Sequence, residues 1–256
     1  MLTQFSRTEL VFGKEGIATL RQKTVAVLGA GGVGSYAMEA LARTGIGTLI
    51  LIDKDTVDIT NINRQLPALH STIGMAKVEV MKQRIADICP QCNVIAKDIF
   101  FLEDTKHELF QYPLDYVVDA IDVLTAKILL IKECVNRNIP IVSSMGAANK
   151  LDPTAFRVMD ISETRVDPIA KVLRRELRKH GIVSGVKTVC SSERPRHGRD
   201  EIRREIVPAD KQEHGRPKEK LPPASTAYVP SVAGLILASV AIHDLLGIDV
   251  TADCDV

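Results

Sequence analysis

Residues 25–34, Val-Ala-Val-Leu-Gly-Ala-Gly-Gly-Val-Gly, form a short apolar run that ends in four glycines. A helical pattern follows directly. A strand, tight turn and helix start of this kind bind phosphate on backbone N–H groups and on the positive end of the helix dipole. The glycines expected to approach the phosphates are Gly29, Gly31, Gly32 and Gly34. Taken alone, the motif predicts a nucleotide site without identifying the nucleotide.

Apolar, β-branched runs alternate with helical patterns through the first 150 residues. Strands are expected at 24–29, 48–53, 93–98, 115–119 and 140–144, and helices at 32–45, 75–89, 103–110 and 124–138. This alternation predicts an α/β fold with a doubly wound, mainly parallel, Rossmann-like sheet. Ligands of such sheets bind at the carboxyl ends of the strands. The residues expected there include Gly29, Asp53, Asp119 or Asp122, and 143–146.

The regular alternation of apolar strands and helical patterns ends after Pro153. We expect a strand at 155–161, a basic helix at 168–180, a strand at 185–191, a mobile loop or crossover at 194–224, and an apolar helix at 232–246 closed by Gly247. A chain of 256 residues is long enough for one large α/β domain. We therefore predict a single domain, with a nucleotide-binding half at 1–150 and an elaborated C-terminal half at 151–256.

The charge distribution is more informative than the net charge of +1. Residues 165–220 hold 16 Lys and Arg against 9 Asp and Glu, which fits the footprint of a phosphate backbone, although a basic helix is by default a solvated face. Five scattered cysteines and a polar N-terminus without a signal peptide predict a reduced, cytoplasmic protein. The apolar run 232–246 is interrupted by polar residues, and we judge it too short and too polar to span a bilayer.

The residues after the second strand distinguish between nucleotides. Asp53 stands where a Rossmann unit places the carboxylate that binds a ribose hydroxyl. Beside the Gly-rich loop then follow polar residues, most of them cationic or amide donors: Asp55, Asn61, Arg64, Gln65 and Lys77. Such donors suit a triphosphate and the charge that develops when its α-phosphate is attacked. A nicotinamide ring needs none of them, so ATP rather than NAD is the expected ligand.

These motifs resemble those of the ubiquitin-activating-enzyme type of adenylating enzymes, whose bacterial members include ThiF and MoeB. The resemblance covers roughly the first 150 residues and rests on Arg7, 29–34, 53–57, 61–65, Lys77 and Asp119-Ala-Ile-Asp122. Within that superfamily the chain looks most like the tRNA threonylcarbamoyladenosine dehydratases. The segments that indicate this are 143–148, 151–154, 189–193, 222–225 and 229–234.

The resemblance implies ATP-dependent adenylation of a carboxylate. It assigns Asp53 to the ribose, Arg64 and Lys77 to the phosphates, and Asp122 to magnesium near the α-phosphate. Arg7 would reach the nucleotide of the partner subunit in a homodimer, whereas local reasoning alone makes it a solvated arm residue. For Asp122 the structural alternative is an ordinary helix N-cap. The catalytic set implied is therefore Arg7, Arg64, Lys77 and Asp122.

The implied substrate is the threonylcarbamoyl group on adenosine 37 of tRNA. An internal atom of that group would close a ring and expel AMP, with net loss of water and with high effective molarity. The segment 165–220 would then contact tRNA. The sequence leaves open whether a monovalent cation is bound and whether the protein has partners in sulfur transfer or tRNA modification.

The cysteines offer weaker alternatives. Cys89 and Cys92 have the spacing of a metal or redox pair, but no second pair completes a zinc site, and they follow a helix instead of starting one. We predict two partly buried thiols and no zinc. Cys190 could form a thioester, as in ubiquitin-type activating enzymes, yet its surroundings predict a packed strand residue.

Two other functions remain open at this point. A sulfur-carrier adenylyltransferase of the MoeB or ThiF type would act on a protein tail, and would use a zinc pair or a sulfur-handling cysteine. A non-catalytic nucleotide-binding scaffold would keep the pocket without the chemistry. The presence of Arg7, Arg64, Lys77 and Asp122 argues against the scaffold.

Overall fold

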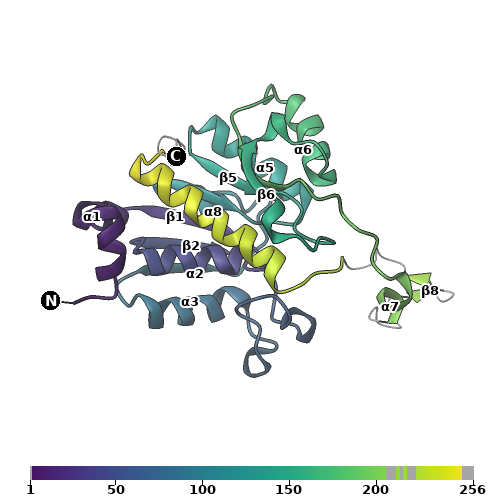
Figure 1. The fold of residues 1–256 in the computed structure, drawn as a ribbon, viewed down its shortest axis with the longest axis horizontal. Helices are drawn as coiled ribbons and strands as arrows, with labels where there is room; N and C mark the ends of the chain where they lie inside the picture. Colours follow the sequence, from purple (N-terminus) through teal and green to yellow (C-terminus); the bar gives the residue numbers. More distant parts are fainter. Residues whose placement is uncertain (1, 206–211, 214–215, 218–222, 250–256) are drawn as a thin grey trace.

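The computed structural model describes residues 2–205, 212–213, 216–217 and 223–249. Its centre is a seven-stranded sheet with the order β3-β2-β1-β4-β5-β7-β6 (Figure 1). The strands are β1 Thr24–Leu28, β2 Thr48–Ile52, β3 Asn93–Lys97, β4 Tyr116–Asp119, β5 Ile141–Ser144, β6 Phe156–Asp160 and β7 Lys187–Ser191. Only β6 is antiparallel to its neighbour β7, and the other pairs are parallel. The predicted doubly wound, mainly parallel sheet is confirmed.

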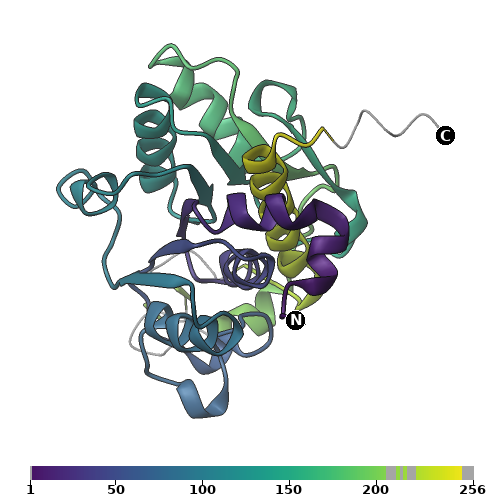
Figure 2. The same cartoon turned by 90° about the vertical axis from the view of Figure 1, so that its left-hand side faces the viewer.

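Helices cover both faces of the sheet. One face carries α1 Ser6–Leu20, α2 Gly34–Thr44, α3 Lys77–Ile88 and α8 Tyr228–Leu246. The other carries α4 His107–Phe110, α5 Leu124–Asn136 and α6 Pro168–Arg178. Short 3₁₀ turns lie at Ile59–Asn61, His70–Thr72, Pro153–Ala155 and Ile161–Glu163. In Figure 2, turned by 90°, α1 lies against α8.

Burial on both faces explains why the strands are apolar throughout. In β1, Val25 and Val27 belong to the core under α2 and α8, whereas Ala26 and Leu28 belong to the core under α5 and α6. A parallel sheet covered in this way needs continuous apolar strands instead of alternating ones. β1 lies between β2 and β4. From β1 the chain adds β2 and β3 on one side, and then returns to add β4 and β5 on the other side. This switch point is where doubly wound sheets bind ligands.

Two predicted segments differ in secondary structure from the observed fold. The helix expected at 103–110 is only α4, four residues long. The loop expected at 194–224 contains α7 Asp200–Glu205 and the paired strands β8 Gln212–Glu213 and β9 Arg216–Pro217, which lie apart from the main sheet (Figure 1). The remainder of that loop lies partly outside the described residues.

The last helix is longer than predicted. α8 begins at Tyr228 and ends at Leu246, where Gly247 adopts φ +66° as its C-cap. With 19 residues and a mean hydropathy of 1.8, it has the length and composition of a membrane span, so the judgement that the segment is too short and too polar was wrong. Its packing explains the composition, because α8 lies across β4 and β5 and against α2 as a core helix.

Candidate functional site

The Gly-rich loop lies at the switch point and is shaped by contacts that allow no side chain. Gly29 has φ +93°, and a Cβ there would lie 2.5 Å from the carbonyl oxygen of Ala120. A Cβ on Gly34 would overlap the carbonyl oxygen of Gly29. Glycine is therefore required at both positions, because the loop folds tightly over the end of β4. The result is a cradle of half-buried backbone before the first turn of α2.

Asp53 follows β2 and ties that strand to the cradle. Its Oδ2 accepts the N–H of Ala30 at 2.5 Å, and its Oδ1 accepts the N–H of Asp55 at 2.7 Å. Burial raises the pKa of Asp53, against the opposing effect of these two backbone donors. Each carboxylate oxygen keeps a further lone pair for a ligand hydroxyl.

The crossover between β2 and α3 brings two predicted residues onto the cradle. A Cβ on Gly32 would lie 3.3 Å from Cγ of Arg64, and one on Gly31 would lie 3.8 Å from Nε2 of Gln65. The half-buried Arg64 guanidinium donates to the carbonyl oxygen of Thr60 at 2.9 Å, and burial lowers its pKa.

Lys77, Asn61 and the carbonyl end of Gln65 differ in whether they already have a partner. Lys77, at the start of α3, is buried and its Nζ lies 2.7 Å from Oδ2 of the exposed Asp55. Asn61 closes a capping box by accepting the N–H of Asp58 at 3.2 Å. Gln65 is 8% exposed, and its Oε1 has no hydrogen-bond partner among the described residues. The Lys77 ammonium is therefore paired with Asp55, whereas Oε1 of Gln65 could accept a hydrogen bond from a ligand.

A buried ion pair beneath the cradle was not predicted. Nζ of Lys127 lies 2.8 Å from Oδ2 of Asp119 and donates to the carbonyl oxygen of Ser144 at 3.0 Å, while the Ser143 hydroxyl donates to the same Asp119 oxygen at 2.6 Å. The side chains of Lys127 and Asp119 are 1% and 0% exposed. The available signal was a lysine in the apolar face of the helix at 124–138, beside Leu130. The pair joins the carboxyl ends of β4 and β5.

Asp122 lies in the loop between β4 and α5. The N–H of Ile121 donates to Oδ1 of Asp119 at 3.1 Å, which fixes this loop beside Gly29. The N-cap of α5 is Val123, with no side-chain cap, so the alternative that Asp122 is an ordinary cap is wrong. Asp122 is exposed at the edge where the cradle lies. Among the described residues no three His, Cys, Asp or Glu side chains gather as a metal site.

Arg7 does not reach the cradle of its own chain. It is an exposed residue of α1. Phe5, two residues earlier, packs on Gly45 at the C-terminal end of α2, whereas the cradle lies at the other end of that helix, before Gly34. α1 also meets α8 near Leu246, the end of α8 that is remote from the cradle.

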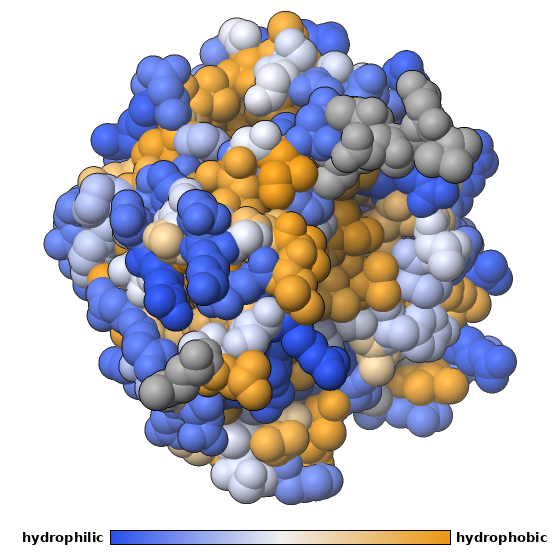
Figure 3. Space-filling model, turned by 60° about the vertical axis from the view of Figure 1, so that its left-hand side comes forward, coloured by the Kyte–Doolittle hydropathy of each residue, from blue (hydrophilic) through white to orange (hydrophobic). Residues whose placement is uncertain are grey.

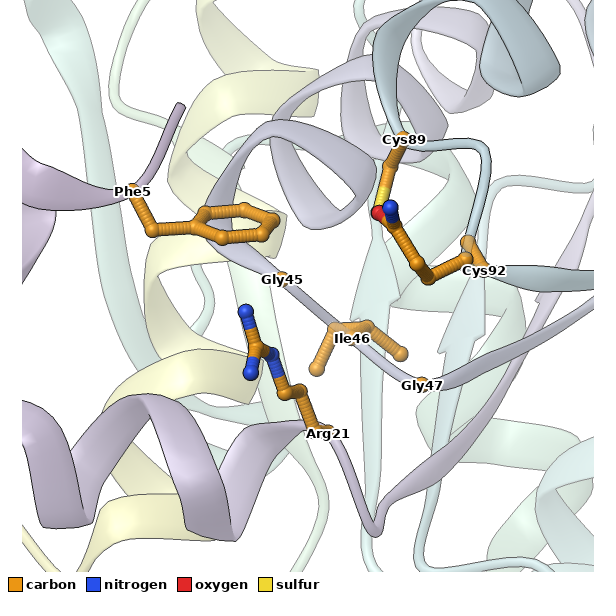
Figure 4. A pocket seen from close by; sticks show the side chains of 8 residues that line it. Phe5, Arg21, Gly45, Ile46, Gly47, Cys89 and Cys92 are labelled. Atoms are coloured by element: carbon orange, nitrogen blue, oxygen red, sulfur yellow. The ribbon is translucent and has the colours of Figure 1, made fainter. Parts of the chain in front are cut away.

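The thiols occupy unreactive positions. Cys89 and Cys92 line a pocket with Phe5, Arg21 and Ile46 at the amino end of the strands, opposite the cradle (Figure 4). Burial raises the pKa of Cys92 to about 12. Cys190 lies in β7, is 2% exposed, and has a pKa raised to about 11 by burial. A thiolate is therefore disfavoured at Cys92 and at Cys190.

The basic segment is only partly a free charged surface. Arg174 is half-buried and donates to Thr164, and Arg175 pairs with Glu176 at 2.9 Å. Lys171 and Arg178, two helical turns apart on α6, are exposed. Asp167 caps this helix by accepting the N–H groups of Ile169 and Ala170, and pairs with the buried Lys150 at 2.9 Å. Parts of 165–220 lie outside the described residues.

Comparisons with known proteins identify the family of this chain. The ThiF family model matches residues 5–254. The tRNA threonylcarbamoyladenosine dehydratase of Bacillus subtilis is 57% identical over 246 residues, which is 96% of each chain. The enzyme of that name from Escherichia coli is 42% identical over 185 residues, 72% of this chain and 69% of that one. The crystal structure of E. coli tRNA N6-threonylcarbamoyladenosine dehydratase in complex with ATP matches with a TM-score of 0.83 and 34% identity, covering 95% of this chain and 94% of the other.

Proposed function

Because this chain belongs to the ThiF family, we propose that it is an ATP-dependent dehydratase acting on the threonylcarbamoyl group of adenosine 37 in tRNA. The observation that carries the proposal is the 57% identity with the B. subtilis enzyme across 96% of both chains. The substrate carboxylate is adenylated with loss of pyrophosphate, and an internal atom of the same group then closes a ring and releases AMP.

The residues around the cradle supply what adenylation needs. Backbone N–H groups of Gly31 to Gly34 hold the phosphates, and Asp53 accepts a ribose hydroxyl. Arg64 offsets the charge that develops as the α-phosphate is attacked. Lys77 turns from Asp55 to the polyphosphate, while Asn61 and Gln65 complete the lining. We propose this set as the nucleotide site.

Asp122 fits a magnesium ion carried by ATP. Mg²⁺ in nucleotide sites uses one or two carboxylates together with substrate phosphates, so one exposed aspartate at the cradle edge suffices. When bound, the ion offsets negative charge on the phosphates. The carboxylate of Asp122 would hold the ion.

Ring closure needs no enzyme thiol. The nucleophile belongs to the substrate, and its effective molarity is high. The buried Cys190, with its raised pKa, is suited to packing, not to thioester formation. This weakens the sulfur-carrier alternative.

The proposed assembly is a cytoplasmic homodimer that binds tRNA on its basic segment. Leu10 and Val11 of α1 are 86% and 75% exposed, and Leu235 of α8 is 48% exposed. Figure 3 shows apolar side chains gathered around a hollow on the side of the molecule that carries α1. Exposed apolar surface of this kind marks an interface, and a partner's Arg7 would complete the site.

The test is a reaction with ATP, magnesium and tRNA bearing the threonylcarbamoyl group. Mass spectrometry of the digested tRNA should show an adenosine lighter by one water, with AMP formed in equal amount. Arg64→Ala and Asp122→Ala should each reduce adenylation by on the order of 10²-fold or more. Wild-type rates in both variants would refute the assigned site, and an unchanged tRNA mass with the wild-type protein would refute the function.

A further inference from the structure

Residues 223–227, here called the strap, bring the chain back across the cradle edge before α8. The strap is held on one side by Asn149, which exchanges two hydrogen bonds with Ala224: the Asn149 N–H donates to the Ala224 carbonyl at 2.8 Å, and Oδ1 accepts the Ala224 N–H at 2.9 Å. On the other side Nδ2 of Asn63 donates to the carbonyl oxygen of Ser225 at 3.1 Å. The strap thus joins the loop after β5 to the turn that carries Arg64.

The helix that follows fixes the strap against the nucleotide loop. Pro230, in the first turn of α8, would contact a Cβ on Gly32 at 3.3 Å, the same distance as Cγ of Arg64. Val229 and Pro230 are buried. The strap is therefore a wall beside the cradle and not a loop elsewhere on the surface.

Within the described residues, two buried side-chain atoms have no hydrogen-bond partner, and both belong to this edge. They are Oε1 of Gln65 and Oγ1 of Thr226. Buried polar atoms in folded proteins are nearly always paired, since leaving one unpaired is costly. Gln65 packs against Gly31 of the cradle, and Thr226 stands one residue beyond the Ser225 carbonyl that Asn63 holds.

We propose that the strap walls the acyl half of the site and that the Thr226 hydroxyl donates a hydrogen bond to the substrate carboxylate, an interaction kept as that group becomes an acyl phosphate. The assignment rests on the proposed function. A neutral donor suits this position because the carboxylate loses its negative charge on adenylation. A cation there would favour the ground state over the transition state. Arg64 and Lys77 serve the polyphosphate, whose charge persists.

The test compares Thr226→Val, which keeps the shape and removes the hydroxyl, with Thr226→Ser, which retains it. Ser225→Ala is the matched control, since Ser225 is tethered through its backbone. We expect Thr226→Val to lower kcat/KM for the modified tRNA by roughly 10- to 100-fold, as for loss of a hydrogen bond to a charged group. Thr226→Ser and Ser225→Ala should stay within about threefold of wild type. The melting temperature should fall in none of the three and should rise in Thr226→Val, because that variant removes an unpaired buried hydroxyl. The ATP dissociation constant should stay unchanged in all three.

Three results would overturn the assignment: an unchanged kcat/KM in Thr226→Val, equal damage in Thr226→Ser, or a comparable loss of ATP affinity in Thr226→Val. Each of these results tests the role of Thr226 independently of the proposed function. A wild-type protein that never forms the dehydrated tRNA refutes the function, whereas an active wild type with an unaffected Thr226→Val variant refutes only the role of Thr226.

Discussion

At the scale of single residues, Lys127 and Asp119 place a full positive and a full negative charge out of contact with water. Removing one partner of such a pair leaves the other charge buried and unpaired. We expect Lys127→Met to lower the free energy of unfolding by about 3–5 kcal/mol. Urea denaturation measures the change, with Lys132→Met on the same helix as the control.

The double variant Asp119→Asn with Lys127→Met separates charge from packing. It removes both charges and keeps the side-chain acceptor for the Ile121 N–H. Stability should recover by more than half relative to Lys127→Met alone. If the single variant loses less than about 1 kcal/mol, the pair is not what holds the loop that carries Asp122.

At the scale of elements, a bidentate pair joins α2 to α3. Nε and Nη2 of Arg84 donate to the two carboxylate oxygens of Glu39 at 2.6 and 3.1 Å. Burial alone would raise the pKa of Glu39, but the hydrogen bonds from Arg84 and Arg43 lower it. Because the folded pKa lies below the unfolded one, this contribution is complete above about pH 4.3 and is lost as the pH falls through the folded pKa.

Glu39→Gln should therefore destabilise the protein by about 1–2 kcal/mol at pH 7. The difference from wild type should shrink as the pH is lowered from 5 to 3. Urea midpoints across that range measure it, beside Glu15→Gln at an exposed position. A gap that stays constant with pH would contradict the ionic origin of the contact.

The exposed charges of α6 give a test of tRNA binding. Neutralising Lys171 and Arg178 to Gln should flatten the dependence of log affinity on log salt by about 2 and leave ATP binding intact. The charge-matched control is Lys14→Gln with Lys82→Gln, both exposed on the opposite face of the sheet. Equal salt slopes in the two double variants, measured by filter binding, would remove α6 from the tRNA surface.

At this scale, features set by the local sequence could be predicted, whereas features set by tertiary contacts could not. The strands ending at Leu28 and Ile52 were predicted to within one residue, because parallel strands buried on both faces are uniformly apolar. Gly29 and Gly34 were identified because a tight turn tolerates only glycine. Lys127 was missed, since its partner Asp119 is brought near by tertiary contact alone. The basic helix at 168–180 was treated as a solvated face by default, and the half-buried position of Arg174 was missed for the same reason.

At the scale of the whole molecule, the remoteness of Arg7 from its own cradle makes the proposed dimer testable. Mixing Arg7→Ala with Asp122→Ala should produce heterodimers in which one of two sites has both residues. With random exchange, activity should recover to about a quarter of wild type. Dehydration assays before and after subunit exchange measure this. Confirmed exchange without recovery would contradict an arginine supplied by the partner.

The contact between Pro230 and Gly32 also has a consequence during translation. About 200 residues separate them along the chain. At roughly 5–20 residues per second the ribosome needs on the order of 10–40 s to cover that distance. Until α8 emerges, the cradle has no wall, and the sheet face over β4 and β5 is uncovered. ATP therefore cannot stabilise the nascent chain through a complete site until α8 has been synthesised.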